Sequence, residues 1–102
     1  MNLVFTPEAW QDYLHWQATD ARQVKRINLL LKEIARAPFG GIGKPEPLKH
    51  EYQGCWSRRI DGEHRVVYKV SGASVWLLQL RLHYRTAKQR QNHRSARGGV
   101  RA

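Results

Sequence analysis

The last strand-like stretch of the chain, residues 75–84, ends in side chains that could bind and cleave a phosphodiester. Side chains alternate between the two faces of a strand, and one face here carries Gln79, Arg81 and His83. The other face is apolar and consists of Trp76, Leu78, Leu80 and Leu82. A guanidinium pairs with phosphate, an imidazole moves protons near neutral pH, and the phenol of Tyr84 follows at once. The alternation predicts a site on the polar face and a core beneath the apolar face.

A second candidate group is Glu46, a carboxylate placed between two prolines and flanked by Lys44 and Lys49. Proline fixes its own backbone angle and restricts the residue before it, so Glu46 is held with little conformational freedom. The glycine-rich run in front of it superficially resembles a phosphate-binding P-loop. That pattern fails, because Pro38 stands where the first glycine belongs and Pro45 follows the lysine where serine or threonine is required.

Together these residues match the needs of metal-independent RNA cleavage. A 2′-hydroxyl can attack its own phosphodiester if a base takes its proton, a cation stabilises the crowded phosphate and an acid protonates the leaving 5′-oxygen. Glu46, Arg65 and His83 could fill these three roles. An antiparallel sheet would bring Arg59 and Arg81 onto the same surface. Spacing alone does not separate this hypothesis from one in which the histidines are structural, with satisfied hydrogen bonds.

Two helices are expected in the N-terminal half, after a short strand at Asn2–Phe5. The first begins with Thr6 as its N-cap and runs to about residue 18. The second begins after Asp20, with Gln23 as the capping-box partner, and ends before Pro38. Its buried stripe has helical spacing and consists of Val24, Ile27, Leu30, Leu31 and Ile34.

Two further strand-like segments are expected to form a hairpin that turns at Asp61-Gly62. A three-residue turn with Gly62 left-handed, which pairs Arg59 with Arg65, is preferred to a two-residue turn because it gathers apolar residues on one face. That face would carry Trp56, Ile60, Val66, Tyr68 and Val70. The opposite face would carry Cys55, Ser57, Arg59, Arg65 and Val67. Arg58 falls on the apolar face and is expected to extend its charged head to solvent at the edge of the sheet.

The totals describe one basic domain of 102 residues with a net charge of +10. Residues 1–84 contribute twelve basic and eight acidic side chains, and residues 85–102 contribute six basic and no acidic ones. Both parts favour a polyanionic partner such as nucleic acid, or an acidic protein. The single cysteine, Cys55, excludes an internal disulfide and cannot by itself form a metal site. No segment has the apolar length of a membrane span or the layout of a signal peptide, so a cytoplasmic location is expected. No cofactor is expected.

Five segments carry a resemblance to a known family. They are Pro7–Trp10 with Asp12–Leu14 and Trp16-Gln17, then Gly43–His50, Gly54–Ile60, Glu63–Tyr68 and finally His83-Tyr84. Over residues 1–84 their order closely resembles the YoeB toxins of the RelE superfamily, the toxin halves of bacterial toxin–antitoxin pairs. In YoeB-like chains the histidine–tyrosine pair lies at or very near the C-terminus, whereas here 18 residues follow it. We expect residues 1–84 to form the toxin domain and residues 85–102 to be a basic extension, either disordered or a short helix over about Thr86–Arg94.

The resemblance implies an α+β fold, in which two N-terminal helices pack on a mainly antiparallel sheet of four to five strands. It also implies an mRNA endoribonuclease that acts in the ribosomal A site. By resemblance, Glu46 is the general base, His83 the general acid and Arg65 the cation that stabilises the transition state. Tyr84 would orient or stack the substrate. Phosphate contacts are expected from Lys49 and Arg59, with Lys44 and Arg81 beside them.

The resemblance further implies a homodimer and a YefM-like antitoxin whose disordered segment folds onto the toxin, with the ribosome and mRNA as further partners and no membrane. Two alternatives remain open. One is a non-catalytic toxin of the RelE/ParE superfamily, like those that act on DNA gyrase, which lack the matched acid, base and arginine. The other is a basic nucleic-acid-binding module driven by the extension, whose binding would weaken steeply with salt. The extension could also anchor ribosomal RNA.

Overall fold

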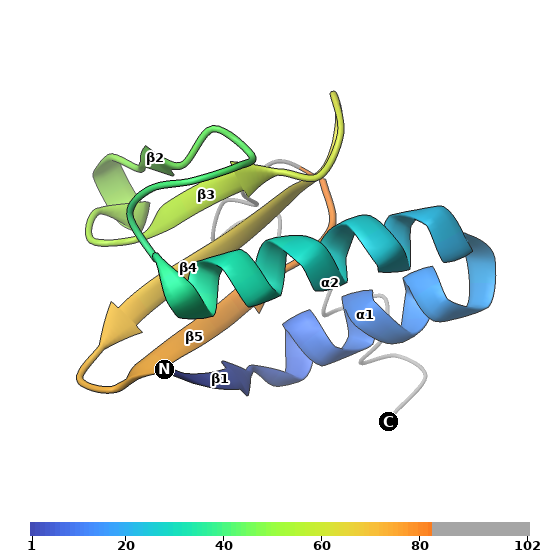
Figure 1. The fold of residues 1–102 in the computed structure, drawn as a ribbon, viewed down its shortest axis with the longest axis horizontal. Helices are drawn as coiled ribbons and strands as arrows, with labels where there is room; N and C mark the ends of the chain where they lie inside the picture. Colours follow the sequence, from blue (N-terminus) through green and yellow to red (C-terminus); the bar gives the residue numbers. More distant parts are fainter. Residues whose placement is uncertain (83–102) are drawn as a thin grey trace.

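The computed structural model describes residues 1–82 and places two helices against one face of a five-stranded sheet (Figure 1). The strands are β1 (Asn2–Phe5), β2 (Glu46–Pro47), β3 (Trp56–Arg59), β4 (Arg65–Ser71) and β5 (Ser74–Gln79). The helices are α1 (Pro7–Thr19) and α2 (Ala21–Arg36), and a short 3-10 helix, η1, spans His50–Tyr52. The strand order is β1-β5-β4-β3-β2, with β1 parallel to β5 and the other neighbours antiparallel. The predicted α+β fold is confirmed.

Both helices begin at the predicted N-caps. The Thr6 hydroxyl accepts a hydrogen bond from a backbone N–H three residues on, at 3.2 Å. The Asp20 carboxylate accepts from the backbone N–H groups of Arg22 and Gln23, at 3.0 and 3.3 Å. The Gln23 side chain does not complete the predicted capping box, because its Nε2 donates to Asp61 Oδ2 at 2.7 Å instead. This hydrogen bond ties the start of α2 to the β3–β4 turn.

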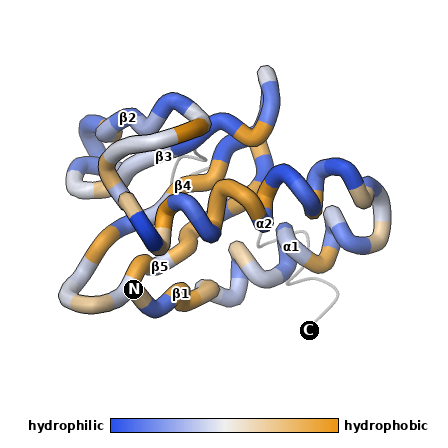
Figure 2. The backbone as a smooth tube through the Cα atoms, viewed as in Figure 1, coloured by the Kyte–Doolittle hydropathy of each residue, from blue (hydrophilic) through white to orange (hydrophobic). Residues whose placement is uncertain are grey.

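The main core lies between the helices and the sheet (Figure 2). The predicted stripe of α2 is confirmed: four of its members, Ile27, Leu30, Leu31 and Ile34, are buried, and Val24 is partly buried. The sheet contributes Ile60, Val66, Tyr68, Val75, Leu77 and Leu80 to the same core. A second, smaller cluster of Leu48, Tyr52, Cys55, Val67 and Leu78 covers part of the opposite face of the sheet.

The last strand does not have the predicted apolar face along its whole length. Trp76 is 43% exposed and Leu78 belongs to the second cluster, whereas Val75 and Leu77 are buried in the main core. Leu82 is 40% exposed. The prediction that Trp76, Leu78 and Leu82 share the core face is therefore wrong.

An extra residue in β5 explains this reversal. Val67 pairs with Gln79 and Tyr68 pairs with Leu77, so Leu78 has no partner of its own in β4. Such a bulge shifts the alternation by one residue, and the side chains that follow change face. Gln79 accordingly shares a face with Val67, and the leucine after it is buried in the main core, both as predicted.

The β3–β4 hairpin has the predicted register, with its two arginines opposite one another. Gly62 does not have the predicted left-handed conformation. Instead, Asp61 Oδ1 accepts hydrogen bonds from the backbone N–H groups of Glu63 and His64, at 2.8 and 2.7 Å. An aspartate can close a turn in this way without a left-handed residue.

Arg58 is fully buried, so the expectation that it would reach solvent is wrong. Its guanidinium donates to the Tyr68 phenol oxygen and to the Ile42 carbonyl, both at 3.1 Å, and to the Ala37 carbonyl. The Tyr68 hydroxyl in turn donates to the Pro38 carbonyl at 2.6 Å. Arginine is tolerated inside the protein because these acceptors replace the water that it loses. The pair fastens the loop after α2 to the sheet.

Candidate functional site

Three predicted site residues lie together on the sheet face that points away from the helices. Glu46 of β2 pairs with Ser57 of β3, and Arg59 lies two residues further along β3, on the same face. Arg59 in turn pairs with Arg65 of β4. Neighbouring strands are about 4.8 Å apart, so β2 and β4 are separated by roughly 10 Å. Glutamate and arginine side chains can close a gap of that size around one phosphate.

The floor between these side chains is formed by Ser57 and Val67. Both are fully buried, and Ser57 pairs with Val67 across the two strands. The Ser57 hydroxyl has no hydrogen-bond partner within residues 1–82. Glu46 and Arg59 are exposed and Arg65 is half-buried, so the charged groups stand at the surface above an apolar floor.

The two predicted lysines border the site on the β2 side, and both are exposed. The backbone N–H of Arg59 donates to the Gly43 carbonyl at 2.7 Å, which holds the loop that precedes Lys44 against the end of β3. Lys49 is the N-cap residue of η1. The backbones of Lys44 and Lys49 are therefore held close to Glu46, as their positions on either side of it in the sequence predict.

Arg81 lies two residues beyond the end of β5 and is half-buried. Gln79 Nε2 donates to its carbonyl at 2.9 Å. The pKa of His15 in α1 is lowered, mainly by burial and next by the positive charge of Arg81. Arg81, at the end of the sheet, is thus near enough to α1 for its charge to lower the pKa of His15. Its contact with phosphate stays a prediction.

The two other predicted catalytic residues, His83 and Tyr84, lie outside the described residues, as do residues 85–102 with their predicted short helix. The last described residue, Leu82, lies beside Arg65, because the Arg65 backbone N–H donates to the Leu82 carbonyl at 2.8 Å. His83 follows Leu82 directly in the sequence, so the described chain leads to it from the Arg65 end of the site.

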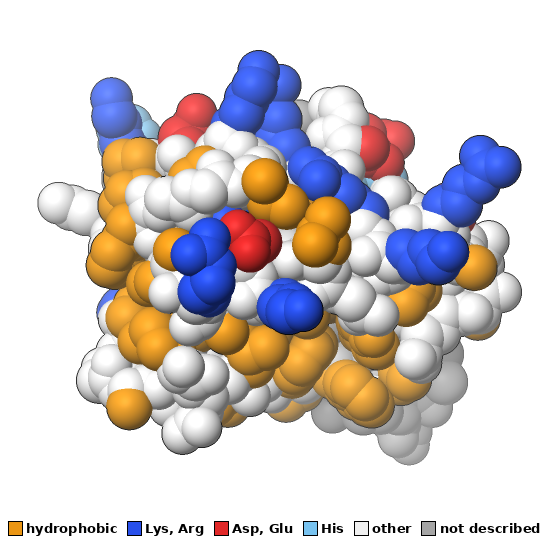
Figure 3. Space-filling model, viewed as in Figure 1, with side chains coloured by type: hydrophobic (Ala, Val, Ile, Leu, Met, Phe, Trp, Pro, Cys, Tyr) orange, Lys and Arg blue, Asp and Glu red, His pale blue; other side chains and the backbone are white. Residues whose placement is uncertain are grey.

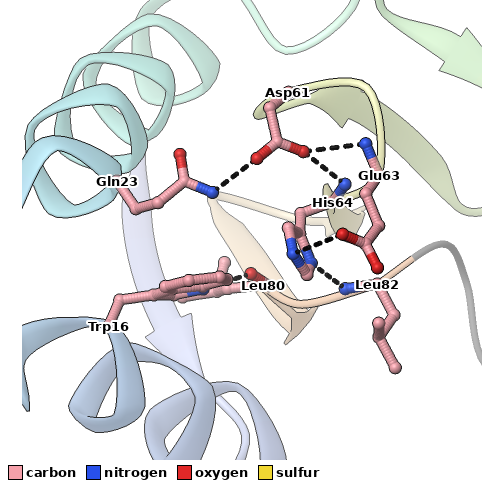
Figure 4. A network of polar contacts seen from close by, with 7 residues as sticks. All are labelled: Trp16, Gln23, Asp61, Glu63, His64, Leu80 and Leu82. Carbon is pink, nitrogen blue, oxygen red and sulfur yellow. Dashed lines mark hydrogen bonds and ion pairs between the residues drawn. The ribbon is translucent and has the colours of Figure 1, made fainter. Parts of the chain in front are cut away.

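A polar network that the sequence did not reveal surrounds Leu82 (Figure 4). The Leu82 N–H donates to His64 Nδ1 at 2.7 Å, and Trp16 Nε1 donates to the Leu80 carbonyl at 2.8 Å. The His64 ring stands edge-on to the Trp16 ring, with 4.8 Å between ring centroids. The other members are Gln23, Asp61 and Glu63. The only signal in the sequence was a histidine next to Arg65, since Trp16 and Leu82, which contact its ring, come from distant segments.

Two members of this network are carboxylates, Asp61 and Glu63. Burial by itself raises the pKa of Asp61, but hydrogen bonds from the N–H groups of His64 and Glu63 and from the Gln23 amide outweigh it, and the pKa of Asp61 is lowered. Glu63 Oε1 lies 3.5 Å from His64 Nε2. Asp61 therefore remains ionised near neutral pH and keeps the turn closed.

The groups gathered at the site are a carboxylate, guanidinium groups and amines, a set suited to holding phosphate and moving protons. Within residues 1–82, no three His, Cys, Asp or Glu side chains are grouped so that they could hold a metal ion. Neither α1 nor α2 has the length and apolar character needed to cross a membrane.

The fold and the basic sheet face define a small α+β toxin of the kind found in bacterial type II toxin–antitoxin systems. Residues 5–84 match the family model described as the YoeB-like toxin of such systems. Toxin YoeB of Escherichia coli K12 is 55% identical over 84 residues, which cover 82% of this chain and 100% of that relative. The chain belongs to the YoeB toxin family.

Solved structures agree with this assignment. A YoeB/ParE toxin from Agrobacterium tumefaciens superposes with a TM-score of 0.80 at 53% identity, covering 82% of this chain and 100% of that one. The toxin in a YoeB–YefM complex from Staphylococcus aureus superposes with a TM-score of 0.76 at 44% identity, and a structure titled as the YoeB dimer of the same species gives 0.76 at 45%. Both cover 82% of this chain and 98% of the other. The predicted resemblance is confirmed.

Proposed function

We propose that this toxin is a ribosome-dependent endoribonuclease that cleaves mRNA in the A site. The observation that carries the proposal is the sheet face shared by Glu46, Arg59 and Arg65, at the end of the sheet from which the chain continues to His83. Membership of the YoeB family supports it. The net charge of +10 supports it as well, because a basic protein is drawn to an RNA-rich target. Such an enzyme would act in the cytoplasm.

In the proposed mechanism, the Glu46 carboxylate removes the proton of a 2′-hydroxyl, and the oxygen attacks the adjacent phosphorus. Arg65 stabilises the extra negative charge of the five-coordinate phosphate. His83 donates a proton to the 5′-oxygen as its bond to phosphorus breaks. The products are a 2′,3′-cyclic phosphate and a free 5′-hydroxyl, so the steps balance without added water. Neighbouring phosphates would be held by Lys44, Lys49, Arg59 and Arg81, and Tyr84 would orient or stack the substrate.

We also propose that the toxin forms a homodimer and is silenced by a YefM-like antitoxin. The relative from Staphylococcus aureus supports both contacts, since its solved structures are a YoeB–YefM complex and a YoeB dimer. The described chain leaves large apolar side chains exposed, among them Phe39 at 56% and Trp10 at 45%. Exposed apolar groups of this size are typical of surfaces that a partner covers.

The test is induced expression of the wild type, Glu46→Gln and His83→Ala, with mapping of mRNA 5′ ends and their chemistry. Removing a general base or acid lowers the rate about 10²–10⁴-fold, so we expect each variant to lose growth arrest and 5′-hydroxyl ends at cleaved codons. Both variants should keep the wild-type melting temperature. Glu33→Gln is the matched control, because Glu33 lies on α2, away from the site face. Co-expression of a neighbouring antitoxin gene should restore growth in the wild type.

Toxicity that survives both substitutions would remove the acid–base assignment. Growth arrest without new mRNA ends would favour a non-catalytic toxin of the same superfamily. RNA binding that falls steeply with salt and is indifferent to His83→Ala would favour a basic binding module.

A further inference from the structure

We propose that His64 is a positioning residue, which holds the backbone of Leu82 and so fixes the point at which the chain enters His83. The inference rests on the proposed function, because it takes His83 as the general acid. It adds a residue to the apparatus that orients that acid.

The Leu82 backbone has an unusual conformation that needs support. Its φ angle is +64°, in the left-handed region that residues with a side chain avoid. β5 has already ended at Gln79, so the regular ladder of the sheet does not impose this conformation. Strained backbone of this kind persists only where surrounding contacts over-determine it, and it concentrates at functional sites.

Two hydrogen bonds hold Leu82, one through its backbone N–H and one through its carbonyl. Its N–H donates to His64 Nδ1 at 2.7 Å, and its carbonyl accepts from the Arg65 N–H at 2.8 Å. The two partners are consecutive residues at the start of β4. The backbone that carries the proposed cation therefore also grips the residue before the proposed acid.

The preceding turn of chain is clamped by α1. The Leu80 N–H donates to Asp12 Oδ2 at 3.0 Å, and the Leu80 carbonyl accepts from Trp16 Nε1 at 2.8 Å. The Trp16 ring also packs against the His64 ring. Leu80 and Leu82 are thus each held through both backbone polar groups, and the Trp16–His64 contact joins the two clamps (Figure 4).

The His64 ring is itself held between two partners. Its Nδ1 accepts the Leu82 N–H, and its Nε2 faces Glu63 Oε1 at 3.5 Å. Only 13% of the side chain is exposed. The Asp61 carboxylate accepts from the His64 backbone N–H at 2.7 Å and so fixes the backbone from which the ring projects. The imidazole is therefore a rigid acceptor aimed at one backbone N–H.

The test compares His64→Leu, His64→Asn and His15→Leu in the full-length toxin. Leucine removes the acceptor with little change of volume. Asparagine restores it, because its Oδ1 stands two bonds from Cβ, where Nδ1 stands in histidine. His15 is the matched control, since its ring also stands edge-on to Trp16, at 4.9 Å, and its side chain makes no hydrogen bond within the described residues.

Two quantities are measured: hydrogen exchange at the Leu82 amide by NMR, and single-turnover cleavage on programmed ribosomes. We expect His64→Leu to raise Leu82 exchange at least tenfold and to lower the single-turnover rate constant at saturating toxin about 10- to 100-fold, since a small misplacement of a reacting group has an effect of this order. The half-saturating toxin concentration should stay within about twofold. His64→Asn should recover most of both quantities, and His15→Leu should change neither.

Slow Leu82 exchange in His64→Leu would overturn the positioning role, and so would equal losses in the leucine and asparagine variants. If His64→Leu does not fold, His64→Gln replaces it, because its acceptor lies one bond too far from Cβ to replace Nδ1. An inactive wild type with a protected Leu82 amide would contradict the proposed ribonuclease and leave the grip of His64 on Leu82 intact. An active wild type with an unprotected Leu82 amide would overturn the positioning role alone.

Discussion

Arg58 and Tyr68 are the residues that join the loop before β2 to the sheet. The guanidinium and the phenol share a hydrogen bond and together reach three carbonyls of residues 37–42. Burial raises the pKa of the Tyr68 phenol, which keeps it protonated and able to donate. The position of the loop that leads to Glu46 therefore depends on the fully buried guanidinium of Arg58.

Replacing Arg58 by methionine tests this dependence. The change leaves two carbonyls and a phenol without their donor in the interior, so we expect the free energy of unfolding to fall by about 3 kcal/mol. Urea unfolding followed by tryptophan fluorescence measures the loss. Arg36→Met is the control, because Arg36 is exposed and its ion pair with Glu33 stabilises little. Equal losses in the two variants would show that the buried contacts do not stabilise the loop.

Single residues could be read from the sequence where chemistry and local geometry coincide. The placement of Glu46, Arg59 and Arg65 on one face followed from the hairpin register and is found in the structure. Arg58 was misread and His64 was left open, since the carbonyls that Arg58 binds and the Leu82 N–H that His64 accepts lie 16 to 21 residues away in the chain. A hydrogen bond between segments so far apart leaves no local pattern.

At the scale of elements, the bulge in β5 decides which residues reach the site. If β5 alternated regularly through residues 75–81, without a bulge, the alternation that buries Val75 and Leu77 would also turn Gln79 and Arg81 toward the helices. The sequence could not show this, because residues 75–78 are apolar at every position and either face suits the core. The helices, by contrast, carry caps and a buried stripe that were predicted nearly to the residue.

Deleting Leu78 should leave the faces of β5 as they are. The deletion joins Leu77 directly to Gln79, and regular alternation then keeps Leu77 in the core and Gln79 beside Val67. Leu78→Ala keeps the bulge and trims only the second cluster, so it should lower stability by about 2 kcal/mol. We expect the deletion to unfold cooperatively by circular dichroism, with a loss of stability close to that of Leu78→Ala. Loss of cooperative unfolding in the deletion variant alone would contradict this account of the bulge.

At the scale of the whole molecule, positive charge is not confined to the site face. Figure 3 shows Lys and Arg side chains projecting from the helix side as well, with hydrophobic side chains exposed between them. Basic side chains on several faces would attract a polyanion from several directions, whereas the site face combines its basic groups with the Glu46 carboxylate. The family match ends at residue 84, so the six basic residues that follow add charge beyond the part shared with the relatives.

Truncation after Tyr84 should preserve cleavage and growth arrest, because every proposed catalytic residue lies before that point. The formal charge falls from +10 to +4, so ribosome binding should weaken and should depend less on salt. Co-sedimentation with ribosomes at low and high KCl measures the change in salt dependence. Loss of ribosome-dependent cleavage in the truncated toxin would show that residues 85–102 take part in function.

The parallel pairing of β1 with β5 has a consequence for how the toxin is made. β1, the first strand to leave the ribosome, can pair only after residues 74–77 have been synthesised. Asp12 and Trp16 of α1 likewise need the Leu80 backbone for their hydrogen bonds. Contacts between the two ends of a chain form late, after most of it has been synthesised. The fold can therefore be completed only after residues 74–80 have left the ribosome, near the end of the synthesis of the described chain.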